Sequence, residues 1–309
     1  MSVIKVDRLT KDYGSGRGVF DVSFNVEKGE VFGFLGPNGA GKSTTIRHLM
    51  GFSKPQSGQT QIFGKDTFDK YYEILRNVGY IPGEIALPAG LTGWEFIRMM
   101  QDLQKCRNDE RLNYLLKLFK LDPSGETKRM SLGVKRKLAV VTAFMNDPDV
   151  LILDEPTSGL DPMMQEVFIE FIKSEKERGK TILLSSHIFS EVDATCDRIA
   201  IIKDGKIVSD FIADDLKHAS QKNYEVGFAD RDNYERFVKS ASHGDIFKLI
   251  SRDENKNTVT VSTDDKYVNG FIEVLSEYSV SSFSHLKETL EDYFMSYYKE
   301  DKNFGGALK

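Results

Sequence analysis

The chain has 309 residues, a formal net charge of −5 and two cysteines, Cys106 and Cys196. At about 150 residues per domain, this length predicts about two domains. A hydrophobic fraction of 40% with 21 Phe and 12 Tyr excludes disorder as the main state. Two cysteines exclude a disulfide scaffold and are too few for a metal site of their own, so we expect reduced thiols. The acidic balance argues against a chain that coats nucleic acid.

No segment predicts a membrane-spanning helix, which needs about 20 apolar residues in a row. The longest apolar runs have four residues, such as 150–153 and 199–202. The N-terminal sequence MSVIKVDRLTKDYG lacks the charged-then-apolar order of a signal peptide. We therefore expect a cytoplasmic chain that reaches a membrane only through a partner.

The first 215 residues alternate strand and helix patterns with glycine-rich turns. Alternating or continuous apolar runs predict strands at 3–9, 20–26, 30–35, 150–153 and 181–184. The last two runs are continuous, as expected for central strands that are covered on both faces. Helical periodicity is found over 44–50 and 163–178. This order predicts an α/β sheet.

From about residue 222 the pattern is that of a small α+β domain. It predicts strands and helices in the order βαββαβ and then a last helix, at 224–228, 231–240, 245–251, 258–262, 267–278, 280–284 and 286–299. This order matches a ferredoxin-like split unit. An apolar stripe on the last helix, which includes Leu290 and Phe294, is expected to pack on the same small sheet. We expect two domains, residues 1–215 and 222–309, joined by a polar linker at 214–222.

The strongest chemical signal is GPNGAGKS at 36–43, which fits the phosphate-loop pattern G-x-x-x-x-G-K-[ST] between a predicted strand and a predicted helix. The glycines let successive backbone N–H groups face a phosphate, and the helix N-terminus adds a positive dipole end. Lys42 is expected to reach the β and γ phosphates, and the Ser43 hydroxyl to bind Mg²⁺. The residues expected to contact ATP here are Gly36, Pro37, Asn38, Gly39, Ala40, Gly41, Lys42, Ser43 and Thr44.

The second signal is LILDEPTSGLDP at 151–162, an apolar strand that ends in two acids. It places both carboxylates at the edge of the sheet where α/β proteins bind ligands. Asp154 is expected to hold Mg²⁺, and Glu155 to polarise the attacking water as a general base. A strand followed by an ordinary polar turn would explain one acid, but not its pairing with a phosphate loop.

Four motifs in this order resemble the ATP-binding subunits of ABC transporters: GPNGAGKST at 36–44, MSLGVKRK at 130–137, LILDEPTSGLDP at 151–162 and LLSSHIFSEVD at 183–193. The similarity runs from about residue 3 to residue 213. It is greatest to exporters of drugs, antibiotics and bacteriocins that have separate ATPase and permease chains. The resemblance implies a P-loop ABC cassette with a mixed sheet core, an antiparallel β subdomain and a helical subdomain.

The resemblance also implies roles for individual residues. Tyr13 would stack on adenine, and Asp161 would lie in the loop that crosses a dimer interface. Ser131 and Gly133 would contact the γ-phosphate held by the other subunit, and His187 would contact the γ-phosphate and position the water. Two copies would then bind two MgATP head to tail and drive a separate membrane permease, which places the chain at the inner face of the cell membrane.

The sequence departs from the family pattern at two motifs. In the signature motif, Leu132 and Val134 occupy the positions of the first glycine and the glutamine. After the segment NVGYIP, where the family has a glutamine that senses Mg²⁺ and the permease, this chain has Gly83 and then Glu84. Glu84 is a candidate for the missing metal or water contact, whereas Gly83 has no side chain to offer.

Two further features have ordinary interpretations. The basic run Lys135-Arg136-Lys137 is expected to be a solvated or interface face of the signature helix rather than a nucleic-acid patch. By analogy with the family, the permease would contact residues 71–100, which include Trp94 and Met100, although core packing would explain the same apolar residues.

The rival function is a soluble ABC-type ATPase that acts on ribosomes or DNA. Translation-type members need two cassettes in one chain, and there is room for one. Chromosome-type members need long heptad arms between the phosphate loop and the signature, and residues 44–129 are too few for them. A GTPase or kinase with a phosphate loop would not explain MSLGVKRK or His187. No nucleic-acid partner is therefore expected, and the cargo is not encoded in this chain.

Overall fold

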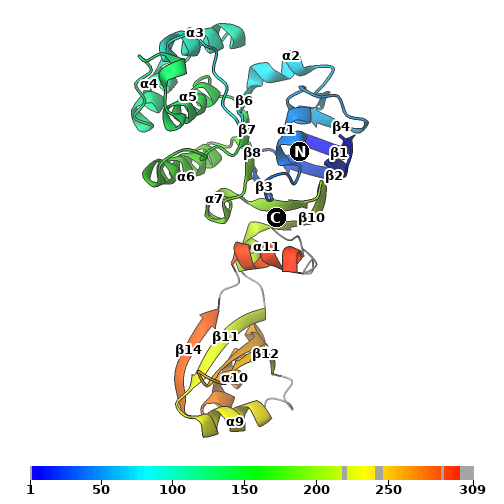
Figure 1. The fold of residues 1–309 in the computed structure, drawn as a ribbon, viewed down its shortest axis with the longest axis vertical. Coiled ribbons are helices and arrows are strands. Elements are labelled where there is room, and N and C mark those ends of the chain that lie inside the picture. Colours follow the sequence, from blue (N-terminus) through cyan, green and yellow to red (C-terminus); the bar gives the residue numbers. More distant parts are fainter. Residues whose placement is uncertain (1, 218–220, 241–245, 287–288, 300–309) are drawn as a thin grey trace, which may run out of the picture. The chain divides into compact units, whose positions relative to one another are not determined.

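A computed structural model of the chain describes residues 2–217, 221–240, 246–286 and 289–299. The chain divides into two compact units, residues 1–213 and residues 214–309. No helix among the described residues is long and apolar enough to cross a membrane. Figure 1 shows the elements of both units.

The first unit is built on a six-stranded sheet with the strand order β10-β9-β3-β8-β7-β6. These strands are β3 (Val31–Leu35), β6 (Val78–Ile81), β7 (Val150–Asp154), β8 (Thr181–Ser186), β9 (Arg198–Lys203) and β10 (Lys206–Ile212). The strands from β9 to β6 run parallel, and β10 is antiparallel to β9. β7 and β8 are buried along their whole length, which confirms the predicted central strands, and β3 is buried in the same way.

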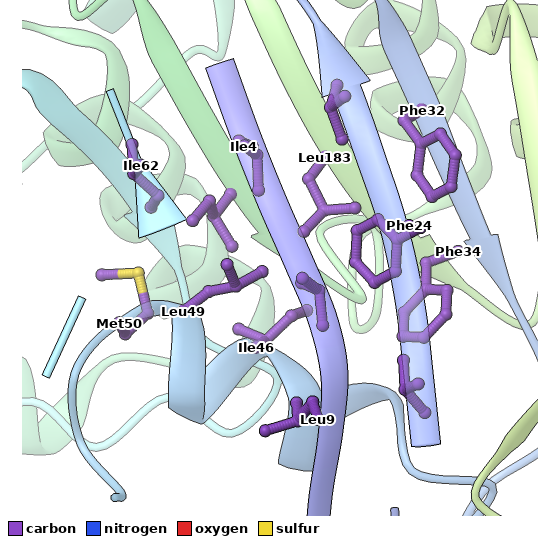
Figure 2. Close-up of a cluster of buried hydrophobic side chains, with 14 of the residues drawn as sticks. Ile4, Leu9, Phe24, Phe32, Phe34, Ile46, Leu49, Met50, Ile62 and Leu183 are labelled. Carbon is purple, nitrogen blue, oxygen red and sulfur yellow. The ribbon is translucent and has the colours of Figure 1, made fainter. Parts of the chain in front are cut away.

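A four-stranded antiparallel sheet in the order β2-β1-β4-β5 forms the second layer of this unit. Its strands are β1 (Ser2–Asp12), β2 (Gly18–Glu27), β4 (Ser57–Ile62) and β5 (Lys65–Asp66). Side chains of both sheets and of the first helix share one hydrophobic core, shown in Figure 2. Within it, Phe24 of β2 stacks on Phe32 of β3 at a ring-centroid distance of 5.0 Å. This packing joins the antiparallel layer to the strand that leads into the phosphate loop.

The helices of the first unit connect these strands. They are α1 (Lys42–Leu49), α2 (Tyr71–Ile74), α3 (Gly93–Gln104), α4 (Asp109–Leu118), α5 (Leu132–Phe144), α6 (Pro162–Glu177) and α7 (Phe189–Thr195), and α8 (Ala213–Lys217) follows β10. Short 3₁₀ turns follow α2 and precede α5. α3, α4 and α5 gather on the side of the unit opposite β1, β2 and β4 (Figure 1). The mixed sheet, the antiparallel layer and this helical group confirm the expected cassette architecture.

The second unit holds one antiparallel sheet in the order β12-β13-β11-β14. Its elements are β11 (Gln221–Phe228), α9 (Arg231–Ser240), β12 (Phe247–Asp253), β13 (Thr258–Asp264), α10 (Val268–Leu275), β14 (Val280–Leu286) and α11 (Leu290–Lys299). This order and pairing confirm the predicted ferredoxin-like unit. Residues 218–220, 245 and 287–288, which belong to the predicted linker, third element and last helix, lie outside the described residues.

The end of the second unit differs from the sequence prediction. Leu286, the predicted start of the last helix, is the final residue of β14, because it continues the ladder opposite Asn223 of β11. Leu290 and Phe294 of α11 are buried. The hydrophobic cluster of the sheet, however, takes its described side chains from the elements before α11. The expected packing of the α11 stripe on this sheet stays a prediction.

Candidate active site

The phosphate loop lies between β3 and α1, at the carboxyl end of a central strand (Figure 1). Gly39 and Gly41 have φ angles of 83° and 114°, which side-chain-bearing residues rarely adopt. A Cβ at Gly36 would lie 2.6 Å from the Ile202 carbonyl oxygen. Glycine is thus required for both the curl of the loop and its close approach to β9, as the motif predicts.

Lys42 is the first residue of α1 and is buried. Its Nζ donates to the carbonyl oxygens of Gly36 at 2.6 Å and Pro37 at 3.3 Å. The same nitrogen lies 3.1 Å from Glu155 Oε1. The ammonium group is therefore held at the centre of its own loop and faces the acid that follows β7.

Glu155 connects Lys42 to His187. Its φ angle is 50°, a left-handed conformation that is uncommon for a residue other than glycine. Its backbone N–H donates to the Ser185 carbonyl oxygen at 3.0 Å. Its Oε2 lies 2.6 Å from His187 Nδ1, and because a carboxylate can only accept, we assign the proton of this bond to Nδ1. One carboxylate thus contacts both the lysine and the half-exposed histidine.

Asp154 ends β7 beside Glu155 and is buried. Ser185 Oγ of β8 donates to its Oδ1 at 2.5 Å. A Cβ added to Gly83 would lie 3.0 Å from its Oδ2. Position 83 therefore faces Asp154, but a glycine there offers only backbone. Glu84 is exposed, and within the described part of the chain its side chain makes no hydrogen bond or ion pair, so its contact with metal stays a prediction.

The oxygen atoms of Ser43 and Asp154 are ligands that suit Mg²⁺, which keeps several waters and substrate phosphates in its shell. The described residues contain no group of three or more His, Cys, Asp or Glu that could hold a metal on its own. The oxygen donors therefore fit an ion that arrives with the nucleotide better than one held in a protein cage.

Four other predicted site residues, Tyr13, Ser131, Gly133 and Asp161, have surroundings of their own. Ser131 and Asp161 cap the N-termini of α5 and α6, where each accepts from a backbone N–H. A Cβ at Gly133 would lie 3.0 Å from the Gly159 carbonyl oxygen, so the start of α5 adjoins the loop before α6. Tyr13 has 56% of its surface exposed. Among the described residues, no hydrogen bond or ion pair joins any of these four to the Lys42–Glu155 pair.

The basic run on α5 contradicts its predicted exposure at one position. Arg136 is 1% exposed, so the expectation that it lies on a solvated or interface face was wrong. Its guanidinium donates to three backbone carbonyl oxygens, because the first turns of α5 lie between two loops that present them. Lys135 and Lys137 are half-buried. Charge alone gave no signal that the middle residue of the run points inward.

Sequence reasoning also missed a buried acid next to the centre. Glu191 of α7 is 1% exposed, and its Oε2 accepts from Ser186 Oγ at 2.5 Å. Burial raises its pKa to about 7, and the nearby Glu155 adds to the increase, whereas the hydroxyls of Ser186 and Thr157 and the charge of Arg136 oppose it. Ser186 Oγ in turn accepts from Ile188 N, so Glu191 supports the turn that carries His187. The sequence feature that could have identified Glu191 is its place about one helical turn after His187.

Comparisons with known proteins agree with this geometry. The family model described as "ABC transporter" matches residues 19–158. The bacitracin transport ATP-binding protein BcrA of Bacillus licheniformis is 39% identical over 250 residues, which cover 79% of this chain and 80% of that protein. The chain belongs to the ATP-binding proteins of ABC transporters. As a member of this family it is an ATP-binding subunit and an ATPase, and an action on ribosomes or DNA is not favoured.

Two further ABC proteins show how far the likeness extends. The uncharacterized ABC transporter ATP-binding protein YhcH of Bacillus subtilis is 31% identical over 306 residues, which cover 97% of each chain, so this alignment includes the second unit. A solved structure described as an ATP-binding subunit of an ABC transporter matches with a TM-score of 0.65 and 33% identity. It covers 70% of this chain and 92% of the other.

Proposed function

We propose that two copies of this ABC ATP-binding subunit bind two MgATP head to tail and power a separate membrane permease that exports a drug, an antibiotic or an antimicrobial peptide. The observation that carries this proposal is the contact of Glu155 with both Lys42 and His187. Within the described part of the chain Ser131 and Gly133 make no hydrogen bond or ion pair with this centre, which supports the dimer, since a second copy could bring its own pair to the nucleotide.

In the proposed reaction, water attacks the γ-phosphorus and gives its proton to Glu155, while the bond from phosphorus to the bridging oxygen of ADP breaks. Lys42 neutralises charge on the transferred phosphoryl group. His187 holds the Glu155 carboxylate through Nδ1, which keeps the base in place for the water. Ser43 and Asp154 would hold Mg²⁺, with Glu84 as a further candidate ligand. When bound, the ion neutralises charge on the β and γ phosphates.

The loop and helix starts would contribute the remaining ATP contacts. The backbone of residues 36–44 would surround the phosphates, and Tyr13 would stack on adenine. Asp161 would lie in the loop that crosses to the other copy. Binding closes the two copies on each other, and hydrolysis followed by phosphate release lets them separate.

The surface proposed to receive the permease is a groove of about 450 Å³ near β6. Exposed or partly exposed apolar side chains line it, among them Phe52, Tyr72, Leu75, Met100 and Leu103. This groove overlaps the region 71–100 that the family resemblance assigns to the permease. Attachment there would place the chain at the inner face of the membrane. The name of the bacitracin transport relative supports an antibiotic-type cargo.

Co-expression with a permease encoded beside this chain tests the proposal. We expect the pair to co-purify and the permease to raise ATP turnover, with further stimulation by its cargo. Tyr72→Asp should abolish co-purification, whereas Tyr114→Asp, a matched change of an exposed tyrosine outside the groove, should not. Equal binding by both variants would contradict the groove assignment. Stable co-purification with ribosomes, and with no permease, would favour the rival function.

The same preparation tests Glu84. Turnover of Glu84→Ala at the wild-type rate, both alone and with permease, would remove Glu84 from the mechanism. A drop in both forms would support a metal or water contact.

A further inference from the structure

Arg136 is a buried cation whose three hydrogen bonds all go to backbone carbonyls of other segments. Its Nη1 donates to the Pro82 oxygen and its Nη2 to the Gly83 oxygen, each at 2.8 Å. Its Nε donates to the Ser158 oxygen, also at 2.8 Å. The guanidinium thus joins helix α5 to the loop after β6 and to the turn after Glu155.

Both joined segments lie directly beside reacting groups. The first contains Gly83, where an added Cβ would lie 3.0 Å from Asp154 Oδ2. In the second, the Ser158 N–H donates to the Glu155 carbonyl oxygen at 3.1 Å, and the next residue, Gly159, lies against Gly133. Helix α5 itself begins at the cap Ser131. One side chain therefore links the signature helix to the segments that carry or face both catalytic acids.

The shape of the side chain matters for these three bonds. A guanidinium has five N–H donors in a fixed plane and can reach acceptors on several sides at once. A lysine ammonium at the same place is a single compact donor group, and a glutamine offers only two N–H donors. Among the described residues no carboxylate accepts from Arg136, so its charge acts on Asp154, Glu155 and Glu191 through space.

We propose that Arg136 is a positioning residue for ATP hydrolysis: it holds the backbone at positions 82, 83 and 158 so that Asp154, Glu155 and the signature helix move as one body. Gly83 supplies no side chain to connect the loop after β6 with Asp154 and Glu155. In this chain the connection is then made by hydrogen bonds from Arg136 to the backbone carbonyls of that loop. The inference rests on the proposed role of Glu155 as the base.

The test compares the full chain carrying Arg136→Met or Arg136→Lys with wild type, and Lys137→Met serves as the matched control on the same helix. ATP turnover gives kcat and KM, thermal unfolding reports stability, and hydrogen–deuterium exchange is followed for peptides that cover 79–90 and 155–162. We expect Arg136→Met to lower kcat by about 10-fold or more, because small displacements of reacting groups are costly. We expect its KM for ATP to stay within about 3-fold of wild type, because the phosphate loop is untouched.

Hydrogen–deuterium exchange distinguishes a local positioning role of Arg136 from a general loss of stability of the first unit. In Arg136→Met both peptides should exchange faster, while peptides of the β1–β2 layer keep their wild-type rates. Arg136→Lys should recover part of kcat, and Lys137→Met should match wild type in every readout. Wild-type kcat in Arg136→Met, or faster exchange spread over the whole first unit, would overturn the proposal.

Should Arg136→Met fail to fold, Arg136→Lys decides. Slower turnover of Arg136→Lys alone does not support the proposal. Unchanged hydrogen–deuterium exchange at 155–162 in this variant would overturn it, and faster exchange at both peptides would support it. A wild-type chain without any turnover would instead contradict the proposed function, and the exchange comparison would still test the link made by Arg136.

Discussion

The two units of the chain bury different kinds of side chain. At the catalytic edge of the first unit, Lys42, Asp154, Arg136 and Glu191 are all at most 5% exposed. In the second unit, the described core is a cluster of aromatic and branched aliphatic side chains around Phe237. Burying charge costs free energy unless partners compensate for the lost water. The first unit thus keeps buried charges next to its phosphate loop, as we expect of a reaction site, whereas the described core of the second unit is apolar.

The largest effect should come from removing packing in the second unit. Phe237 is fully buried, and its ring lies within 5.4 Å of the rings of Phe228, Phe247 and Tyr278, all in the same unit. Phe237→Ala should lower the free energy of unfolding of this unit by about 3–5 kcal/mol and leave kcat unchanged. Thermal unfolding and ATP turnover of the full chain measure the two quantities. Lost turnover with unchanged stability would show that the second unit takes part in hydrolysis.

The next effect is expected at Lys42. Lys42→Ala removes the cation that we propose faces the transferred phosphoryl group, so kcat should fall by about 100-fold or more, which corresponds to roughly 3–4 kcal/mol. Lys65→Ala is a suitable control, because Lys65 is exposed and pairs with Glu73 on the surface. Steady-state turnover at saturating ATP checks the prediction. A Lys42→Ala chain as active as the control would show that this buried charge is structural.

Glu191 should make stability depend on pH. Its pKa is raised from the ordinary 4.5 to about 7, so the folded chain binds a proton there that the unfolded chain releases. Stability should therefore fall as pH rises from about 5 to 7, and the loss should be complete above about 7, at about 3 kcal/mol. Glu191→Gln keeps a hydrogen-bond acceptor for Ser186 and should flatten this slope. Denaturant unfolding at a series of pH values measures it; equal slopes in both chains would refute the assignment.

The smallest effect is expected at Tyr13, the exposed residue that we propose stacks on adenine. Tyr13→Ala should raise KM for ATP by about 3- to 10-fold and leave kcat nearly unchanged, because ring stacking contributes about 0.5–1.5 kcal/mol. Tyr13→Phe should behave like wild type, since the ring is retained. An unaltered KM in Tyr13→Ala would mean that adenine binds elsewhere.

The sequence predicts much of this molecule because its strongest patterns are local. The glycines, Lys42, Asp154 and Glu155 are found at strand ends where motif spacing places them, and the order βαββαβ follows from alternating elements. Arg136 was missed because a basic run on a helix normally faces water, and only the carbonyls of two distant loops make its burial possible. Leu286 was assigned to a helix because local apolar spacing cannot show the ladder that it forms with β11.

We propose that Glu155, in contact with Lys42 and His187, is the base for ATP hydrolysis. The most direct measurement combines turnover with light scattering of Glu155→Gln in the presence of MgATP. This change keeps the size of the side chain and removes its ability to accept the proton, so we predict that turnover falls by about 100-fold or more. ATP should remain bound, and a stable dimer should accumulate. Hydrolysis at the wild-type rate, with no trapped dimer, would show that Glu155 is not the base.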